Sequence, residues 1–154
     1  MTEMRIDNAR EPEQIRRMQE LERSGECHFC LESFVQRYPN KIIHGGPDWY
    51  IVPNDFAYPG SVHHYLIVSK HHITRVGDVS YSGRIELFSS ITWLENHLKV
   101  TGESIFVRSG DMAYTGASLD HLHFHFLVGV EKSNPKEKDN PEEVIWAPLG
   151  YKKK

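Results

Sequence analysis

The chain has 154 residues, of which 39% are hydrophobic and 25% are charged, a composition typical of one globular domain with a substantial core and not of a disordered protein. Its formal net charge of −3 excludes binding of a nucleic acid polymer through bulk electrostatics, and no apolar run approaches the roughly 18–20 residues that span a membrane. Two cysteines are too few for a disulfide scaffold, and the charged residues 1–30 lack the apolar core of a signal peptide, so we expect a cytoplasmic protein.

The N-terminal half of the chain predicts one short helix followed by strands. Apolar residues at a three-residue step predict an amphipathic helix over 11–23, which ends at Gly25. A compact turn at 27–30 follows, and a polar, proline-containing loop is expected at 54–62. The predicted strands of this half lie at 40–45, 48–53 and 64–69. The last of these is fully apolar and suits the centre of a sheet.

The C-terminal half predicts one long helix and two further strands. The helix spans 80–99 and stops before Gly102. Its apolar side chains lie near one stripe: Ile85, Phe88, Ile91 and Leu98, widened by Leu87 and Leu94. Strands are expected at 104–108 and 121–130, separated by a polar loop at 109–119. The chain is therefore expected to be α+β, with an antiparallel sheet of about five strands, one long helix and a short N-terminal helix. We expect a single domain over 1–154, with its core at about 27–130 and a C-terminal tail at 131–154.

Three of the ten histidines alternate with apolar residues near the end of the chain. On a strand, His121, His123 and His125 share one face, while Leu122, Phe124 and Phe126 share the other. The simplest interpretation is a solvent-facing row, although such rows usually consist of Lys, Glu, Thr and Ser. A second is a catalytic metal site, because His-x-His on a strand suits zinc. The third is nucleophilic catalysis, because a neutral imidazole is a nucleophile near pH 7.

The only two cysteines form half of a metal site. Cys27 and Cys30 are separated by two residues, a spacing that lets both thiolates reach one ion; a redox pair and two buried cysteines are the alternatives. The other ligands should then be histidines, and His72 and His121 both lie at ends of predicted strands. These four residues predict a closed structural zinc site that stabilises the fold. His123 and His125 remain for the substrate.

Residues 121–127 resemble the His-x-His-x-His signature of the histidine-triad (HIT) superfamily of nucleotide hydrolases and transferases. Further resemblance covers most of 27–129: the apolar strand with its basic and histidine residues at 65–72, and the metal-ligand set of the zinc-containing members. The Asn54-Asp55-Phe56 segment is similar to the one that holds the ribose. Residues 146–150 (Trp-Ala-Pro-Leu-Gly) resemble a C-terminal segment of nucleoside phosphoramidases that approaches the partner subunit's site.

The resemblance implies an antiparallel meander with helices on one side, usually paired as a homodimer. It implies that His123 attacks the α-phosphorus and becomes nucleotidylated, and that His125 contacts the phosphate oxygens. Ser118 matches a hydroxyl donor near the scissile bond. Asp55, with Asn54, would accept hydrogen bonds from the ribose.

This sequence departs from the family pattern at two positions. Many relatives have a polar amide where this chain has Ala117, and asparagine where it has Arg108. Ala117 removes one hydrogen-bond donor from the site and Arg108 adds one positive charge. Both changes affect which leaving group the site would prefer. Arg108, His125, Ser118 and the backbone N–H groups of 110–117 are the candidate phosphate ligands of this acidic protein. The glutamine of true uridylyltransferases is absent after His125.

The leading hypothesis is a nucleotide hydrolase or nucleotidyltransferase that acts on a dinucleoside polyphosphate or a nucleoside phosphoramidate through nucleotidyl-His123. A metallohydrolase with a catalytic metal on the three strand histidines is one alternative. A non-catalytic nucleotide-binding protein is the other.

Overall fold

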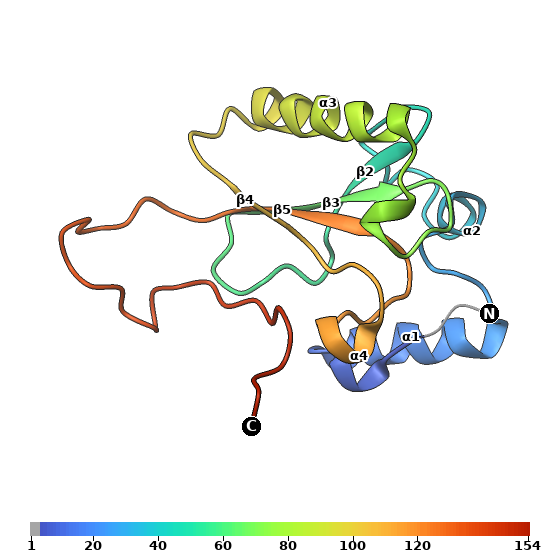
Figure 1. Cartoon of the computed structure of the whole chain (residues 1–154), viewed down its shortest axis with the longest axis horizontal. Coiled ribbons are helices and arrows are strands. Elements are labelled where there is room, and N and C mark those ends of the chain that lie inside the picture. The colour runs from blue at the N-terminus through green and yellow to red at the C-terminus, as the bar shows by residue number, and fades with distance from the viewer. Residues whose placement is uncertain (1–3) are drawn as a thin grey trace.

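The computed structural model describes residues 4–154 and consists of one sheet with helices on both faces (Figure 1). The strands are β1 (His44–Gly45), β2 (Trp49–Pro53), β3 (His63–Ser69), β4 (Ser104–Val107) and β5 (His123–Val128). The helices are α1 (Pro12–Ser24), α2 (Leu31–Arg37), α3 (Tyr81–Leu98) and α4 (Met112–Thr115), with 3-10 turns η1 (Ile6–Asn8) and η2 (Val76–Asp78). The five strands are antiparallel in the order β1-β2-β3-β5-β4. The predicted α+β class is confirmed.

Helix α3 covers one face of the sheet, and α1 and α4 lie on the opposite side (Figure 1). The core beneath α3 contains Trp49, Ile51, Ile67, Leu94, Leu122 and Phe126. The core of the opposite face contains Cys27, Phe29, Phe34, Tyr50, Val52, Leu66 and Val68. The apolar side of the histidine segment therefore packs toward α3, as its alternation predicts.

The central pair β3–β5 determines what faces the opposite side. Leu66 of β3 lies opposite His125, and Val68 lies opposite His123. Because cross-strand partners share a face, both histidines point to the side that α3 does not cover. His64, two residues before Leu66, faces the same side.

Strand β5 begins at His123 and not at His121, which corrects the predicted strand. The Leu122 N–H donates to the Ile73 carbonyl at 2.7 Å, and the Leu122 carbonyl accepts from the Ser69 N–H at 3.1 Å. These bonds tie Leu122 to the end of β3 and to the loop that follows it, so His121 lies outside the strand. Its ring still contacts Phe29, as the ring of His123 does, on the side of the sheet that α3 does not cover.

Helix α3 has apolar residues on its buried side and on its exposed side. The single stripe expected from the sequence contains residues of both sides. Leu94 is 0% exposed, whereas Ile85 and Phe88 are 56% and 71% exposed. The inner face consists of Gly83, Leu87, Ser90, Ile91 and Leu94. The predicted stripe is correct for Leu87, Ile91 and Leu94 and wrong for Ile85 and Phe88, because apolar residues on more than one side of a helix do not reveal which side is buried.

Two short helices were not predicted. Helix α2 is a seven-residue element in which only Phe34 is buried, and α4 is a single turn inside the segment expected to be loop. Asp111 caps α4, because its side chain accepts from the Ala113 N–H at 2.8 Å. β1 is also shorter than the strand expected at 40–45. Within residues 4–154, no helix has both the length and the apolar character needed to cross a bilayer.

Candidate active site and metal cluster

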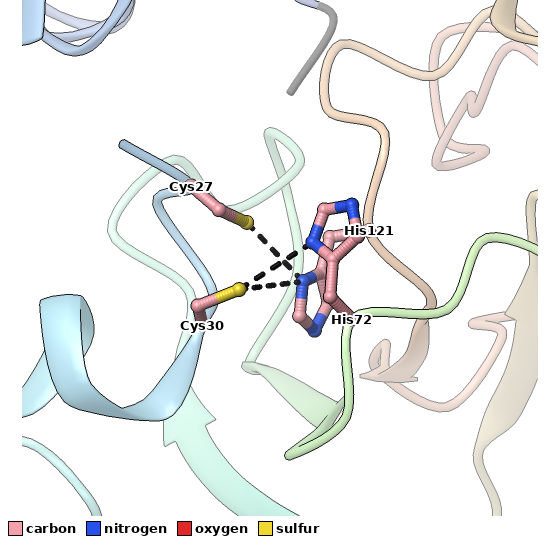
Figure 2. A group of neighbouring side chains, drawn as sticks. All are labelled: Cys27, Cys30, His72 and His121. Atoms are coloured by element: carbon pink, nitrogen blue, oxygen red, sulfur yellow. Dashed lines mark hydrogen bonds between the residues drawn. The ribbon is translucent and has the colours of Figure 1, made fainter. Parts of the chain in front are cut away.

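Cys27, Cys30, His72 and His121 converge from three distant parts of the chain (Figure 2). Their ligand atoms all lie within 4.8 Å of one another. Cys27 Sγ is 3.2 Å from His121 Nδ1, and Cys30 Sγ is 3.4 Å from His72 Nδ1. Tetrahedral zinc, with bonds of about 2.3 Å to sulfur and about 2.0 Å to nitrogen, separates such ligands by roughly 3.5 Å. The donor set and its spacing fit one tetrahedral ion.

The surroundings of the cluster also suit a cation. His121 Nε2 lies 2.7 Å from the Ser69 carbonyl oxygen and must donate to it, which leaves the lone pair on Nδ1, the atom facing the cysteines. Burial and then the neighbouring Cys27 raise the pKa of Cys30 to about 12. A thiolate at this position therefore needs a bound cation to be stable.

His123 has one ring nitrogen fixed by the backbone. Its Nδ1 lies 2.7 Å from the His121 carbonyl oxygen and donates to it. The lone pair is therefore on Nε2. Burial, and then the positive charge of Arg108, lower the pKa of His123 to about 4, outweighing the backbone hydrogen bond that raises it. The imidazole is neutral at physiological pH.

His125 lies between another histidine and an arginine. His125 Nδ1 is 2.8 Å from His64 Nε2, and His125 Nε2 is 3.2 Å from Arg108 Nη1. Burial, and then the neighbouring His123 and Arg108, lower the pKa of His125. Burial and then the charge of Arg10 lower the pKa of His64 to about 4. Both imidazoles are neutral in the folded protein.

One cavity contains all six residues assigned to catalysis or nucleotide binding. It is lined by Asn54, Asp55, Arg108, Ser118, His123 and His125. It opens on the face of the sheet that α3 leaves free, and α1 contributes Arg17, Met18 and Leu21 to its wall. The cluster of Cys27, Cys30, His72 and His121, which could hold a metal ion, adjoins this cavity through the backbone of His121.

Asp55 is held in place by two cations. Its carboxylate accepts from Arg17 Nη1 at 2.7 Å and from Lys41 Nζ. Burial opposes the charged form, but these two hydrogen bonds together lower the pKa of Asp55. Asn54 has a local role as well, because its Oδ1 accepts from the Phe56 N–H at 3.0 Å. The pair is thus fixed at the cavity wall.

Ser118 lies on a loop that the N-terminal segment holds. The Arg5 N–H donates to the Ser118 carbonyl at 3.0 Å, and Asn8 Nδ2 donates to the Ala117 carbonyl at 2.7 Å. Asn8 also accepts from the Tyr151 hydroxyl at 3.1 Å. Residues from both ends of the described chain therefore position the loop.

Two residues of the site have no sequence signal: Arg10 and Tyr58. His63, His64 and His71 flank an apolar strand, a position from which they could line the pocket or serve a structural role. Of these, His64 contacts His125. Arg10 and Tyr58 come from irregular segments and meet only in the folded chain. The guanidinium of Arg10 lies 3.9 Å from the centroid of the Tyr58 ring.

Comparisons with known proteins agree with this architecture. A family model described as HIT domain matches residues 37–132. A HIT family hydrolase from Clostridium thermocellum is 25% identical, with a TM-score of 0.56, and the match covers 72% of this chain and 96% of that one. A histidine triad nucleotide-binding protein from Candida albicans is 19% identical, with a TM-score of 0.55 and coverage of 76% and 88%. A zinc-bound histidine triad family protein from Mycobacterium smegmatis is 17% identical, with a TM-score of 0.54 and coverage of 77% and 85%. No curated protein matches the sequence.

Proposed function

Because this chain belongs to the HIT domain family, we propose that it is a nucleotide hydrolase or nucleotidyltransferase that acts at the α-phosphate through a covalent nucleotidyl-His123 intermediate. The observation that carries the proposal is the bond from His123 Nδ1 to the His121 carbonyl. It leaves the free lone pair on Nε2 of a neutral, half-buried imidazole in the cavity wall.

The reaction takes two steps. His123 Nε2 attacks the α-phosphorus, a P–N bond forms, and the bond to the leaving group breaks with its electron pair on the leaving group; an amine leaving group takes up a proton from solvent as it departs. Water then attacks the same phosphorus, releases one proton to solvent, and breaks the P–N bond, whose electron pair returns to Nε2 and restores neutral His123. Donors aimed at the phosphate are sufficient for this chemistry. His125, Arg108 and the Ser118 hydroxyl supply them, while Asn54 and Asp55 bind the ribose.

The proposed cofactor is structural zinc, held by Cys27, Cys30, His72 and His121. Bound zinc neutralises the two thiolates and links the N-terminal segment to the sheet. His121 commits Nδ1 to this cluster and Nε2 to the Ser69 carbonyl. It is therefore not available to share a catalytic metal with His123 and His125, which disfavours the metallohydrolase alternative.

We also propose a homodimer. Tyr81, Ile85 and Phe88 form an exposed apolar row along α3, with Tyr81 80% exposed. The edge strand β4 exposes Ile105 beside an unpaired backbone. A second copy that covers both features would bury this apolar area and satisfy the strand edge.

Intact-mass spectrometry tests the nucleotidyl intermediate. Wild-type protein, quenched during turnover of a dinucleoside polyphosphate or a nucleoside phosphoramidate, should gain the mass of one nucleotidyl group, located on His123 by peptide mapping. His123→Asn should form no adduct and lose at least 1,000-fold in kcat, an estimate of about 4 kcal/mol in the barrier. His97→Asn, an exposed histidine on α3, is the matched control and should behave as wild type. An undiminished rate in His123→Asn would contradict the proposal, and tight binding without turnover would favour a non-catalytic nucleotide-binding protein.

A further inference from the structure

Beside the proposed reaction centre, the cavity wall has more positive charges and hydrogen-bond donors than the protein itself neutralises. The residues that supply them are Arg10, Arg108 and His125. The geometry points to an anion subsite here that binds the phosphates of the leaving group. This inference rests on the proposed function and narrows its substrate class to nucleotides with an anionic phosphoanhydride leaving group, such as dinucleoside polyphosphates, over nucleoside phosphoramidates.

The two arginines meet at one aromatic ring. Arg108 Nη2 donates to the Tyr58 hydroxyl at 2.7 Å, while the Arg10 guanidinium lies over the face of the same ring. Tyr58 is only 4% exposed, so its position is fixed by packing. The ring holds two like charges near each other, an arrangement that costs energy until an anion is bound.

Of the four cationic side chains that the described residues contribute to the cavity wall, two form ion pairs with a carboxylate and two do not. Arg17 and Lys41 both contact Asp55. Among residues 4–154, by contrast, no carboxylate forms an ion pair with Arg10 or Arg108. Their side-chain hydrogen bonds go to neutral acceptors instead, Arg10 to the Phe56 carbonyl and Arg108 to the Pro148 carbonyl and the Tyr58 hydroxyl. In the described part of the chain, neither arginine is thus neutralised by an ion pair, although the nearby Glu11 carboxylate attracts the charge of Arg10.

Counting protons along the His64–His125–Arg108 row gives the same conclusion. The row has three contacts: Tyr58 N–H to His64 Nδ1 at 3.1 Å, His64 Nε2 to His125 Nδ1 at 2.8 Å, and His125 Nε2 to Arg108 Nη1 at 3.2 Å. The backbone N–H and the guanidinium can only donate, and each neutral imidazole carries one proton. Four protons therefore occupy three contacts, so one contact has a donor facing a donor.

The backbone decides which contact this is. The Tyr58 N–H donates to His64 Nδ1, so His64 carries its proton on Nε2 and donates to His125 Nδ1. His125 then carries its proton on Nε2, the atom that faces Arg108. The Nε2–H group of His125 and the guanidinium N–H group of Arg108 therefore point toward each other, with no acceptor from the described residues between the two. An anionic oxygen that lies to one side of this pair, within hydrogen-bond distance of both nitrogens, would accept from both and remove the conflict.

The charge of the leaving group distinguishes the two substrate classes. The scissile α-phosphorus of either class bears one negative charge, for which His125 and one arginine are sufficient. When a phosphoanhydride is cleaved, the P–O bond breaks and its electron pair stays on the oxygen of the departing phosphate, where the second arginine stabilises the added charge. An amine leaving group is neutral or positive and gains nothing from the second arginine.

The experiment compares two substrates of the same nucleoside, a dinucleoside triphosphate and a phosphoramidate. For the wild type, kcat/KM should be at least tenfold higher for the triphosphate. Arg10→Gln should lower that value at least tenfold while changing the phosphoramidate value less than threefold. Arg108→Gln should lower both values, because Arg108 also contacts the α-phosphate of either substrate. Arg16→Gln, which removes the same charge from the exposed side of α1, is the matched control and should change neither. Arg108→Lys, which keeps the charge, should retain most of the preference.

Calorimetric titration with inorganic pyrophosphate measures the subsite without turnover. Pyrophosphate should bind the wild type and Arg16→Gln equally, and bind Arg10→Gln and Arg108→Gln at least tenfold more weakly, with thermal unfolding confirming that the variants are folded. Equal losses of kcat/KM on both substrates in Arg10→Gln, or pyrophosphate affinity unchanged in both arginine variants, would overturn the inference. Turnover of neither substrate with no adduct on His123 would instead contradict the proposed function, and the pyrophosphate titration would still decide the subsite.

Discussion

The side chain of His121 belongs to the Cys27–Cys30–His72–His121 cluster proposed to hold zinc, while its backbone carbonyl accepts the Nδ1 proton of His123 at 2.7 Å. One residue therefore connects the stability of the cluster to the orientation of the proposed nucleophile. Movement of His121 should alter the tautomer and the direction of the His123 ring, although His123 itself contacts no metal ligand atom.

Removing the metal should reduce stability and activity together. The purified protein should contain about one zinc ion per chain by mass spectrometry, and chelation should lower Tm by 10 °C or more, because structural zinc contributes several kcal/mol to folding. kcat should fall with the loss of folded protein and recover when zinc is restored. Cys27→Ser should reproduce the effect, whereas His71→Gln, beside His72 but outside the cluster, should not. A metal-free protein with unchanged Tm and full activity would contradict the structural role.

Stability should decrease in weakly acidic solution because His64 is buried in its neutral form. Its pKa is about 4 in the folded protein against 6.5 for the ordinary side chain, so the unfolded chain binds more protons between these values. The protonation of His64 therefore does not affect the free energy of unfolding above about pH 6.5. That free energy decreases by about 2–3 kcal/mol as the pH falls from there toward 4, because the unfolded chain takes up the proton first.

Urea unfolding of wild type and His64→Phe at pH 7.5, 6 and 5 measures this effect. The variant should be less stable at pH 7.5, and the difference between the two proteins should shrink as the pH falls. The proposed zinc site contributes the same pH dependence to wild type and to His64→Phe, so it drops out of the difference between their unfolding free energies. His97→Phe should keep the wild-type slope, and a constant difference between wild type and His64→Phe would show that burial of His64 does not control the titration.

Asn8→Ala should loosen the Ser118 loop. The substitution removes two hydrogen bonds, to the Ala117 carbonyl and from the Tyr151 hydroxyl, and should cost about 1–2 kcal/mol of unfolding free energy. kcat should fall about three- to tenfold, because Ser118 loses its position against the leaving group. Hydrogen exchange should become faster in residues 116–119. Asp7→Ala, at the exposed neighbouring position, should leave both the exchange and kcat unchanged.

The two apolar sides of α3 should respond differently to substitution. Leu94→Ala should cost about 2–5 kcal/mol of unfolding free energy because it leaves a cavity under the helix. Phe88→Glu should leave the fold intact and convert the dimer to a monomer, as measured by light scattering after size-exclusion chromatography. A monomeric wild type would contradict the proposed homodimer, and an undisturbed dimer in Phe88→Glu would place its interface elsewhere.

Period-two patterns made the sheet and much of the site predictable. The alternation at 121–126 correctly assigns Phe124 and Phe126 to the α3 side, and the spacing of Cys27 and Cys30 identifies half of the cluster. The roles of Ser118, Asn54 and Asp55 remain predictions, although all three line the cavity. These positions follow from local patterns and from the resemblance to the family.

What the sequence could not provide depends on contacts between distant segments. The bond between His64 and His125 requires the pairing of β3 with β5, and the approach of Arg10 to Tyr58 requires the N-terminal segment to cross the cavity. The limits of β5 depend on hydrogen bonds from Leu122 to the loop after β3. No periodicity encodes such contacts, because each is determined by packing across dozens of residues.

The hydrogen bond between Asn8 and Tyr151 joins two segments that both lie outside residues 37–132, the part of the chain that matches the family model. The tail leaves the sheet and returns toward α4 (Figure 1), where a Cβ at Gly150, whose φ is +136°, would lie 3.1 Å from the Tyr114 carbonyl oxygen. Asn8, Arg10 and Pro148 line the same cavity. Part of the cavity rim therefore comes from outside the family match. A chimaera that exchanges only residues 4–10 and 146–151 with those of another family member would change the surroundings of the substrate while leaving Cys27, Cys30 and the sheet in place.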